Sequence, residues 1–185
     1  MARNLFWSAP IDDCTNFCHK WIETYPDFIP LKRILAKHYV DEYMRSNSAP
    51  EYVQFSLDFF CELIANKGNR EPVDFYYLSK IYSWLAHCNN KQEYIDYAFK
   101  LLEDGIKLYP DYWQFHSELA TLFTQQSKFD KALKEAFEAK RKAPWRETIY
   151  NLISSIYNFM GDITNAENYK QESEALKERK QELYK

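Results

Sequence analysis

The chain has 185 residues, of which 46% are hydrophobic and 18% aromatic, with only three glycines and seven prolines. This composition excludes a disordered tail or a loop-rich fold, and the length suits one domain or one short repeat array. The net charge of −3 combines 24 basic and 27 acidic residues spread along the chain, which leaves no basic stripe for a nucleic-acid backbone.

The sequence also predicts the cellular compartment of the protein. No segment approaches the ~20 consecutive apolar residues that span a bilayer, and the segment from Met1 to Trp7 lacks the apolar run of a secretory signal. We therefore expect a cytoplasmic protein with no membrane partner. In that reducing environment the cysteines are expected to be small apolar core residues, and they are Cys14, Cys18, Cys61 and Cys88.

The first predicted element is a helix over 10–25, which begins near Ser8 and Pro10. Its apolar residues recur at helical spacing and predict one buried side, made of Ile11, Cys14, Phe17, Trp21 and Tyr25. We interpret this helix as an N-terminal cap. A helical hairpin is expected next, over 27–67, with Leu35, Ala36 and Tyr39 on its first helix and an aromatic second helix that ends at Gly68.

Further hairpins are predicted over 72–109 and 111–143. In the first of these, an insertion around Trp84 to Asn90 predicts a first helix longer than usual. In the second, Ser127 and Asp130 suit a capping box at the start of the second helix. The apolar positions of this hairpin are Phe115, Leu119, Leu122 and Phe123, then Phe129, Ala132, Leu133, Ala136 and Phe137.

A last hairpin is predicted over 145–173, with Gly161 as the stop of its first helix and Asp162 as the N-cap of its second. Residues 174–185 are rich in Glu and Lys and are expected to extend this helix as a solvated cap. A repeat period is also visible, because Pro110 and Pro144 lie 34 residues apart.

Two segments carry a recognisable pattern. They are Leu119-Ala120-x-x-Phe123 with Ala132, Ala139 and Pro144, and Ile153-Ser154-x-x-Tyr157 with Gly161 and Ala166. This pattern resembles the tetratricopeptide repeat, most clearly over 111–173 and in a degenerate form upstream. The resemblance implies an all-α fold, a right-handed superhelical solenoid of antiparallel helical hairpins. We expect about nine helices in a single domain over 1–185.

The sequence contains little that supports a catalytic or metal-binding site. Cys14-x3-Cys18-His19 is the strongest candidate zinc site, but only two of its ligands share a helix face. Glycines at 68, 105 and 161 make neither a phosphate-binding loop nor a nucleophile elbow. We therefore expect no cofactor, no metal site and no enzymatic activity.

The resemblance implies a module that binds a protein or peptide in a concave groove lined by the first helix of each hairpin. Amides and hydroxyls in that groove suit a peptide backbone, and its cations favour a partner with some acidic character. Alternatives are a regulatory or substrate-recognition subunit of an enzyme on another chain, or a scaffold like the half-a-tetratricopeptide RNA-processing factors. Self-association through Leu5-Phe6-Trp7 is a further alternative. The expected groove residues are Arg33, Lys37, Tyr76, Lys80, Gln114, Ser117, Thr121, Gln125, Asn151, Ser155 and Asn158.

Overall fold

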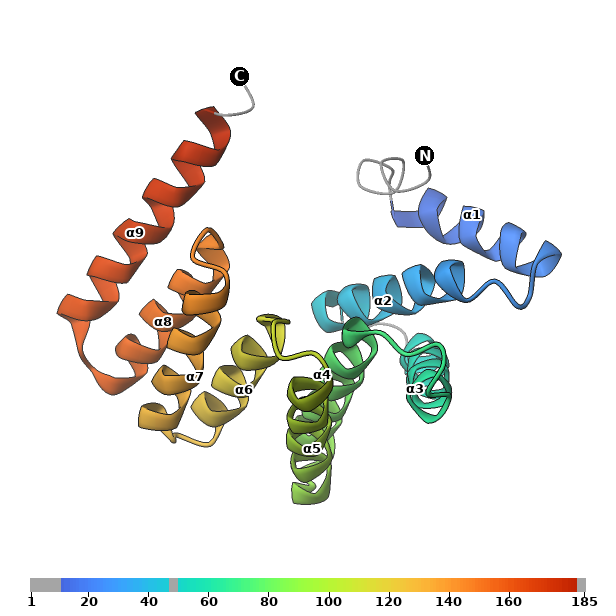
Figure 1. Ribbon diagram of the computed structural model, residues 1–185, viewed down its shortest axis with the longest axis horizontal. Coiled ribbons are helices and arrows are strands. Elements are labelled where there is room, and N and C mark those ends of the chain that lie inside the picture. Colours follow the sequence, from blue (N-terminus) through green and yellow to red (C-terminus); the bar gives the residue numbers. More distant parts are fainter. Residues whose placement is uncertain (1–10, 47–49, 183–185) are drawn as a thin grey trace. The chain divides into compact units, whose positions relative to one another are not determined.

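The computed structural model describes residues 11–46 and 50–182, and every regular element in these ranges is an α-helix. The chain divides into two compact units, 1–70 and 71–185. The first unit holds α1 (Ile11–Thr24), α2 (Ile29–Ser46) and α3 (Pro50–Ala65) (Figure 1). The second holds α4 (Pro72–Asn89), α5 (Gln92–Leu108), α6 (Gln114–Gln125), α7 (Phe129–Lys142), α8 (Glu147–Met160) and α9 (Ile163–Glu182).

The first unit is built around α2, which contacts both α1 and α3. Toward α3, the small side chain of Ala36 permits a close crossing, and the Ser56 hydroxyl donates a hydrogen bond to the Ala36 carbonyl at 3.0 Å. The Tyr39 ring stacks on Tyr52 with the ring centroids 4.3 Å apart. Toward α1, the buried cluster consists of Cys18, Leu31, Leu35 and Tyr39, with Ile22 and Ile34 packed against it.

The expected buried side of α1 is wrong in part. Phe17, Trp21 and Tyr25 expose 47%, 45% and 53% of their surface, although the rings of Trp21 and Tyr25 stack on each other at 5.5 Å. The helix packs on α2 through Cys18 and Ile22 instead, because only that narrower face meets the neighbouring helix. The segment Leu5-Phe6-Trp7 lies outside the described residues.

The cysteine prediction is also only partly right. Cys18 is fully buried and fills the role of a small apolar side chain, whereas Cys61 and Cys88 are exposed. Both exposed thiols lie on the solvent side of their helices, α3 and α4, beside buried neighbours such as Phe60 and Ala86. The side chain of Cys14 lies outside the described part of the chain.

The second unit consists of helical hairpins, in which α4 pairs with α5, α6 with α7, and α8 with α9. The first helix of the first hairpin, α4, has 18 residues, against 12 in α6 and 14 in α8. This difference confirms the longer helix predicted from the insertion around Trp84 to Asn90.

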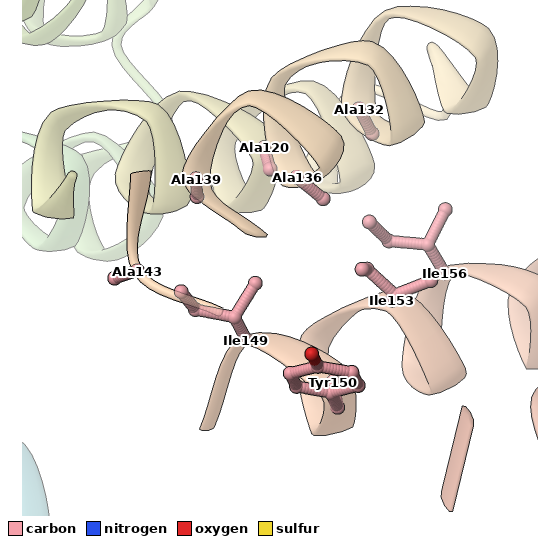
Figure 2. Packing of buried hydrophobic residues seen from close by; sticks show 9 residues of the cluster. All are labelled: Ala120, Ala132, Ala136, Ala139, Ala143, Ile149, Tyr150, Ile153 and Ile156. Atoms are coloured by element: carbon pink, nitrogen blue, oxygen red, sulfur yellow. The ribbon is translucent and has the colours of Figure 1, made fainter. Parts of the chain in front are cut away.

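Successive hairpins are held together by an alternation of small and large side chains. Figure 2 shows alanines of α6 and α7 facing isoleucines of α8 across the interface between two hairpins. Alanine lets the backbones of the helices approach, and the isoleucine fills the space that remains. Phe123 and Tyr157, the aromatic residues of the two repeat patterns, are partly buried and pack against this cluster. The cluster itself contains Ala120, Ala132, Ala136, Ala139, Ala143, Ile149, Tyr150, Ile153 and Ile156.

The helix ends show one correct and one wrong prediction. Gly161 ends α8 with a φ of 79°, and the Asp162 carboxylate accepts a hydrogen bond from the Asn165 backbone N–H at 3.1 Å, as expected of an N-cap. The predicted capping box at Ser127 and Asp130 does not form. Ser127 takes a left-handed φ of 56° in the turn, and Lys128 becomes the N-cap of α7 without a capping hydrogen bond from its side chain.

One close approach joins the first two hairpins of this unit. A Cβ atom at Gly105 of α5 would lie 2.6 Å from the Cζ atom of Phe115. The Phe115 ring, fully buried, therefore lies directly on the α5 backbone, in a space that only glycine leaves open.

Candidate functional site

The contacts between helices give the second unit a curved surface. The first helices of successive hairpins touch, because α4 contacts α6 and α6 contacts α8. Among the described residues of this unit, the second helices lie farther apart: the backbone of α7 does not come close to that of α5 or α9, and α7 reaches α9 only through side chains such as the Lys140–Glu172 ion pair at 3.3 Å. When successive helices lie closer together on one side of a stack than on the other, the stack curves toward the side with the shorter spacing. We call the side of α4, α6 and α8 that points away from α5, α7 and α9 the inner face of the second unit. This face is therefore concave.

The helices α4 and α6 carry predicted positions and are joined by a hydrogen bond. The Ser83 hydroxyl of α4 donates to the Gln125 side-chain oxygen of α6 at 3.5 Å, which joins the C-terminal parts of the two helices. One turn earlier on α4, the Lys80 ammonium lies 5.4 Å from the centre of the Tyr76 ring and 5.3 Å from that of Tyr77. These cation–π contacts fix the position of the ammonium group.

The other predicted positions on α6 are half-buried and only partly satisfied. The Thr121 hydroxyl donates to the Ser117 carbonyl at 3.1 Å, which leaves its oxygen able to accept a further bond. The side-chain oxygen of Gln114 is buried and has no hydrogen-bond partner among the described residues. A buried amide oxygen without a partner costs about 1–3 kcal/mol, so a rearrangement that gave Gln114 a donor would be favourable.

Asn151, Ser155 and Asn158 follow one line along α8 and are all exposed. Their spacing of four and three residues places them on one side of the helix. Their side chains make no hydrogen bond to any other residue that the structure describes. They offer amide and hydroxyl groups to solvent without an internal competitor.

Arg33 and Lys37 belong to the first unit, and the inner face defined above does not include them. Arg33 is only 7% exposed, and its guanidinium donates to the Asn69 carbonyl at 2.8 Å. This bond ties α2 to the segment after α3. Arg33 therefore stabilises the first unit and has little surface left for a ligand. Lys37 is half-buried on the same helix.

The inner face contains one residue that the sequence analysis missed. Glu118 of α6 lies four residues after Gln114 and three before Thr121, on the same side of the helix. Desolvation by the surrounding protein raises the pKa of its carboxyl group to about 7, although the positive charge of Lys80 opposes this shift. A side chain that keeps some solvent access while losing much of its hydration is typical of a concave floor. The helical spacing of four residues from Gln114 leads to Glu118, so the sequence pattern could have indicated this position.

Replacing Glu118 by glutamine is expected to change how stability depends on pH. The folded state holds a proton on this carboxyl that the unfolded state releases between about pH 4.5 and 7, so the contribution of Glu118 to stability falls as pH rises through that window. Glu118→Gln should therefore exceed the parent in unfolding free energy by about 1–3 kcal/mol near pH 8, with a smaller gap near pH 5. Urea unfolding of both proteins across this range measures the gap.

Glu103→Gln, at an exposed position of α5, is the matched control, and its unfolding free energy should stay within about 0.5 kcal/mol of the parent, as is usual for a surface substitution. A gap between Glu118→Gln and the parent that stays constant from pH 5 to pH 8 would show that the Glu118 carboxyl titrates normally.

The predicted positions on α6 and α8 carry amide and hydroxyl side chains. These amides and hydroxyls both donate and accept hydrogen bonds, which matches the alternating N–H and C=O groups of a peptide backbone. Within the described ranges, no group of three or more His, Cys, Asp or Glu side chains lies close enough to hold a metal ion. In the same ranges, no helix has the length and hydrophobicity that crossing a membrane requires.

No protein-family model matches the sequence, and no curated protein matches it. Among solved structures, the chain is similar to TTC0263, a thermophilic TPR protein of Thermus thermophilus, with 17% identity and a TM-score of 0.76 over 88% of this chain and 81% of that one. It is similar to MamA at 16% identity and a TM-score of 0.63, over 93% and 91% of the two chains. It is also similar to YrrB, a TPR protein with an unusual peptide-binding site, at 14% identity and a TM-score of 0.55, over 90% and 77%.

At these identities the likeness concerns the fold. The chain has an all-α fold similar to that of tetratricopeptide repeat proteins, with nine helices in its described part that pack as sequential hairpins. The fold class predicted from the pattern over 111–173 is therefore confirmed.

Proposed function

We propose that this protein is an interaction module that binds an extended peptide or a helix of a protein partner on the inner face of its second unit. The observation that carries the proposal is the line of exposed, internally unbonded polar side chains on α8, beside the half-buried polar side chains of α6. Three neighbouring helices thus present hydrogen-bonding groups on one concave surface.

The proposed contact residues are those of the sequence analysis that lie in this unit, together with Glu118. They include one cation, Lys80, and one carboxyl group, that of Glu118, whose pKa is raised to about 7, so the net charge of this surface is small. A ligand held mainly by its backbone suits such a surface better than a strongly charged one. YrrB, which shares the fold, is a TPR protein with an unusual peptide-binding site, and this supports a peptide as the ligand class.

An arginine on the α8 part of the inner face is expected to block the ligand. Random peptides displayed on phage are panned against the full chain, and the affinities of the enriched peptides are measured by fluorescence polarisation. Asn151→Arg should weaken their binding by at least about tenfold, a loss of about 1.4 kcal/mol, because it replaces an amide with a longer, charged side chain. The helix itself should be unaffected, since Asn151 is exposed.

Asn168→Arg is the matched control, because Asn168 is an exposed asparagine of α9, away from the inner face. It should leave affinity within about twofold of the parent. Equal losses from Asn151→Arg and Asn168→Arg would place the peptide elsewhere, and a panning experiment that enriched no peptide would reject the proposal itself.

A further inference from the structure

A second surface feature lies at the C-terminal end of the second unit. A pocket of about 350 Å³ is formed by the turn between α7 and α8 and by the last turns of α9, and it shares no residue with the inner face. Its lining consists of Trp145, Arg146, Leu176, Arg179 and Lys180.

The pocket exists because α9 is longer than the helix it packs on. α9 has 20 residues against 14 in α8 (Figure 1). The Ser173 hydroxyl donates to the Glu147 carbonyl at 3.0 Å, which fixes the register between the two helices. Because the helices are antiparallel, the residues of α9 after Ser173 continue past the first residue of α8 and face the turn that precedes it.

Positive charge gathers at this pocket. The Arg179 guanidinium forms no ion pair with any residue in the described ranges, and the Arg146 guanidinium lies over the Trp113 ring at 5.7 Å. The Lys180 ammonium has one acidic neighbour, the Glu147 carboxylate, at 3.8 Å. In the part of the chain that the structure describes, these three cations thus have one carboxylate at ion-pair distance, and an anionic ligand would balance the remaining positive charge.

The rest of the lining is apolar. Trp145 exposes 62% of its surface, and Leu176 is half-buried beside it. An exposed tryptophan offers a large apolar surface, and this residue type is common where a partner's side chain is anchored. A free inorganic anion would satisfy the cations but would leave this surface uncovered.

We propose that this pocket binds an acidic segment of a protein partner. An aromatic or aliphatic side chain of the segment packs on Trp145 and Leu176, and carboxylates on either side of it pair with Arg146, Arg179 and Lys180. The volume lies at the lower end of the range of about 300–1,000 Å³ that is usual for ligand sites, which fits one large side chain. This site is independent of the inner face and stands whether or not that face binds a peptide.

The test uses the full chain and a fluorescein-labelled synthetic peptide in which a phenylalanine is flanked by glutamates. We expect saturable binding that weakens as salt is added, because the contacts between charges are screened. Arg179→Ala combined with Lys180→Ala should lower affinity by at least about tenfold. Trp145→Ala should lower it to a similar extent without changing the salt dependence.

Lys170→Ala, at an exposed position of α9 outside the pocket, is the control and should bind as the parent does. Two peptide controls separate the contributions, since replacing the glutamates by glutamine or the phenylalanine by alanine should each weaken binding. Binding that is unchanged in the Arg179→Ala, Lys180→Ala double variant would overturn the proposal. Inorganic phosphate or adenosine monophosphate that bound as tightly as the peptide would also overturn it, in favour of a small-anion site.

Discussion

Replacing Phe115 by alanine is expected to lower the free energy of unfolding by about 3–5 kcal/mol. The ring is fully buried and lies on the backbone of Gly105, and a second aromatic ring, that of Tyr112, has its centroid 4.8 Å away. Removing the ring loses its apolar burial and leaves a cavity. Since α5 and α6 approach each other through this contact, the cavity would lie in the interface between them, where close packing makes a void costly.

Urea unfolding of the full chain, followed by the helical circular dichroism signal, measures the loss. Phe159→Ala is the matched control, because Phe159 exposes 68% of its surface at the end of α8. Its cost should be below about 1 kcal/mol, since little area is removed from the folded state. Similar losses for the two variants would show that Phe115 does not fill the interface between α5 and α6.

Replacing Ile153 by alanine is expected to cost about 2–5 kcal/mol. Ile153 is fully buried in the cluster of Figure 2, where it faces the alanines of the preceding hairpin. Alanine on both sides of the interface would leave the space between them poorly filled. The neighbouring α6–α7 and α8–α9 hairpins would then lose part of the surface that joins them, so their unfolding should become less cooperative.

Ile163→Ala serves as the control, because Ile163 begins α9 and exposes 55% of its surface. Ile153→Val provides a graded step and should cost only about 0.5–1.5 kcal/mol, since a single methyl group is removed. The hypothesis fails if Ile153→Ala and Ile163→Ala have the same unfolding midpoint in urea.

The second unit was predictable from the sequence because its side chains repeat by size. The small residues of the repeat pattern, such as Ala120 and Ala132, are fully buried, and Ser154 is nearly so, with its hydroxyl donating to the Ala166 carbonyl at 2.7 Å. Their positions follow from the helical period, so they can be predicted without knowing which distant residues are in contact. Gly161 and Asp162 were predictable for the same reason, because capping depends on adjacent residues.

Features that depend on the environment of a side chain were not predictable. Arg33 was expected on the ligand side, but its guanidinium hydrogen bonds to a carbonyl 36 residues away, which no local pattern indicates. Likewise, the sequence shows Glu118 as one glutamate among many, and its raised pKa arises only when the curved stack removes water from the carboxyl group. The aromatic side of α1 was misjudged because periodicity shows which residues share a face, but not how much of that face a neighbour covers.

Every contact between helices of the second unit joins helices that are adjacent in the chain or next but one. A topology so local in sequence requires no closure of long loops, and domains of this kind reach the native state quickly. During translation, each hairpin can pack on its predecessor as soon as it leaves the ribosome, without waiting for residues made later. The order of synthesis is therefore also an order in which the molecule can assemble.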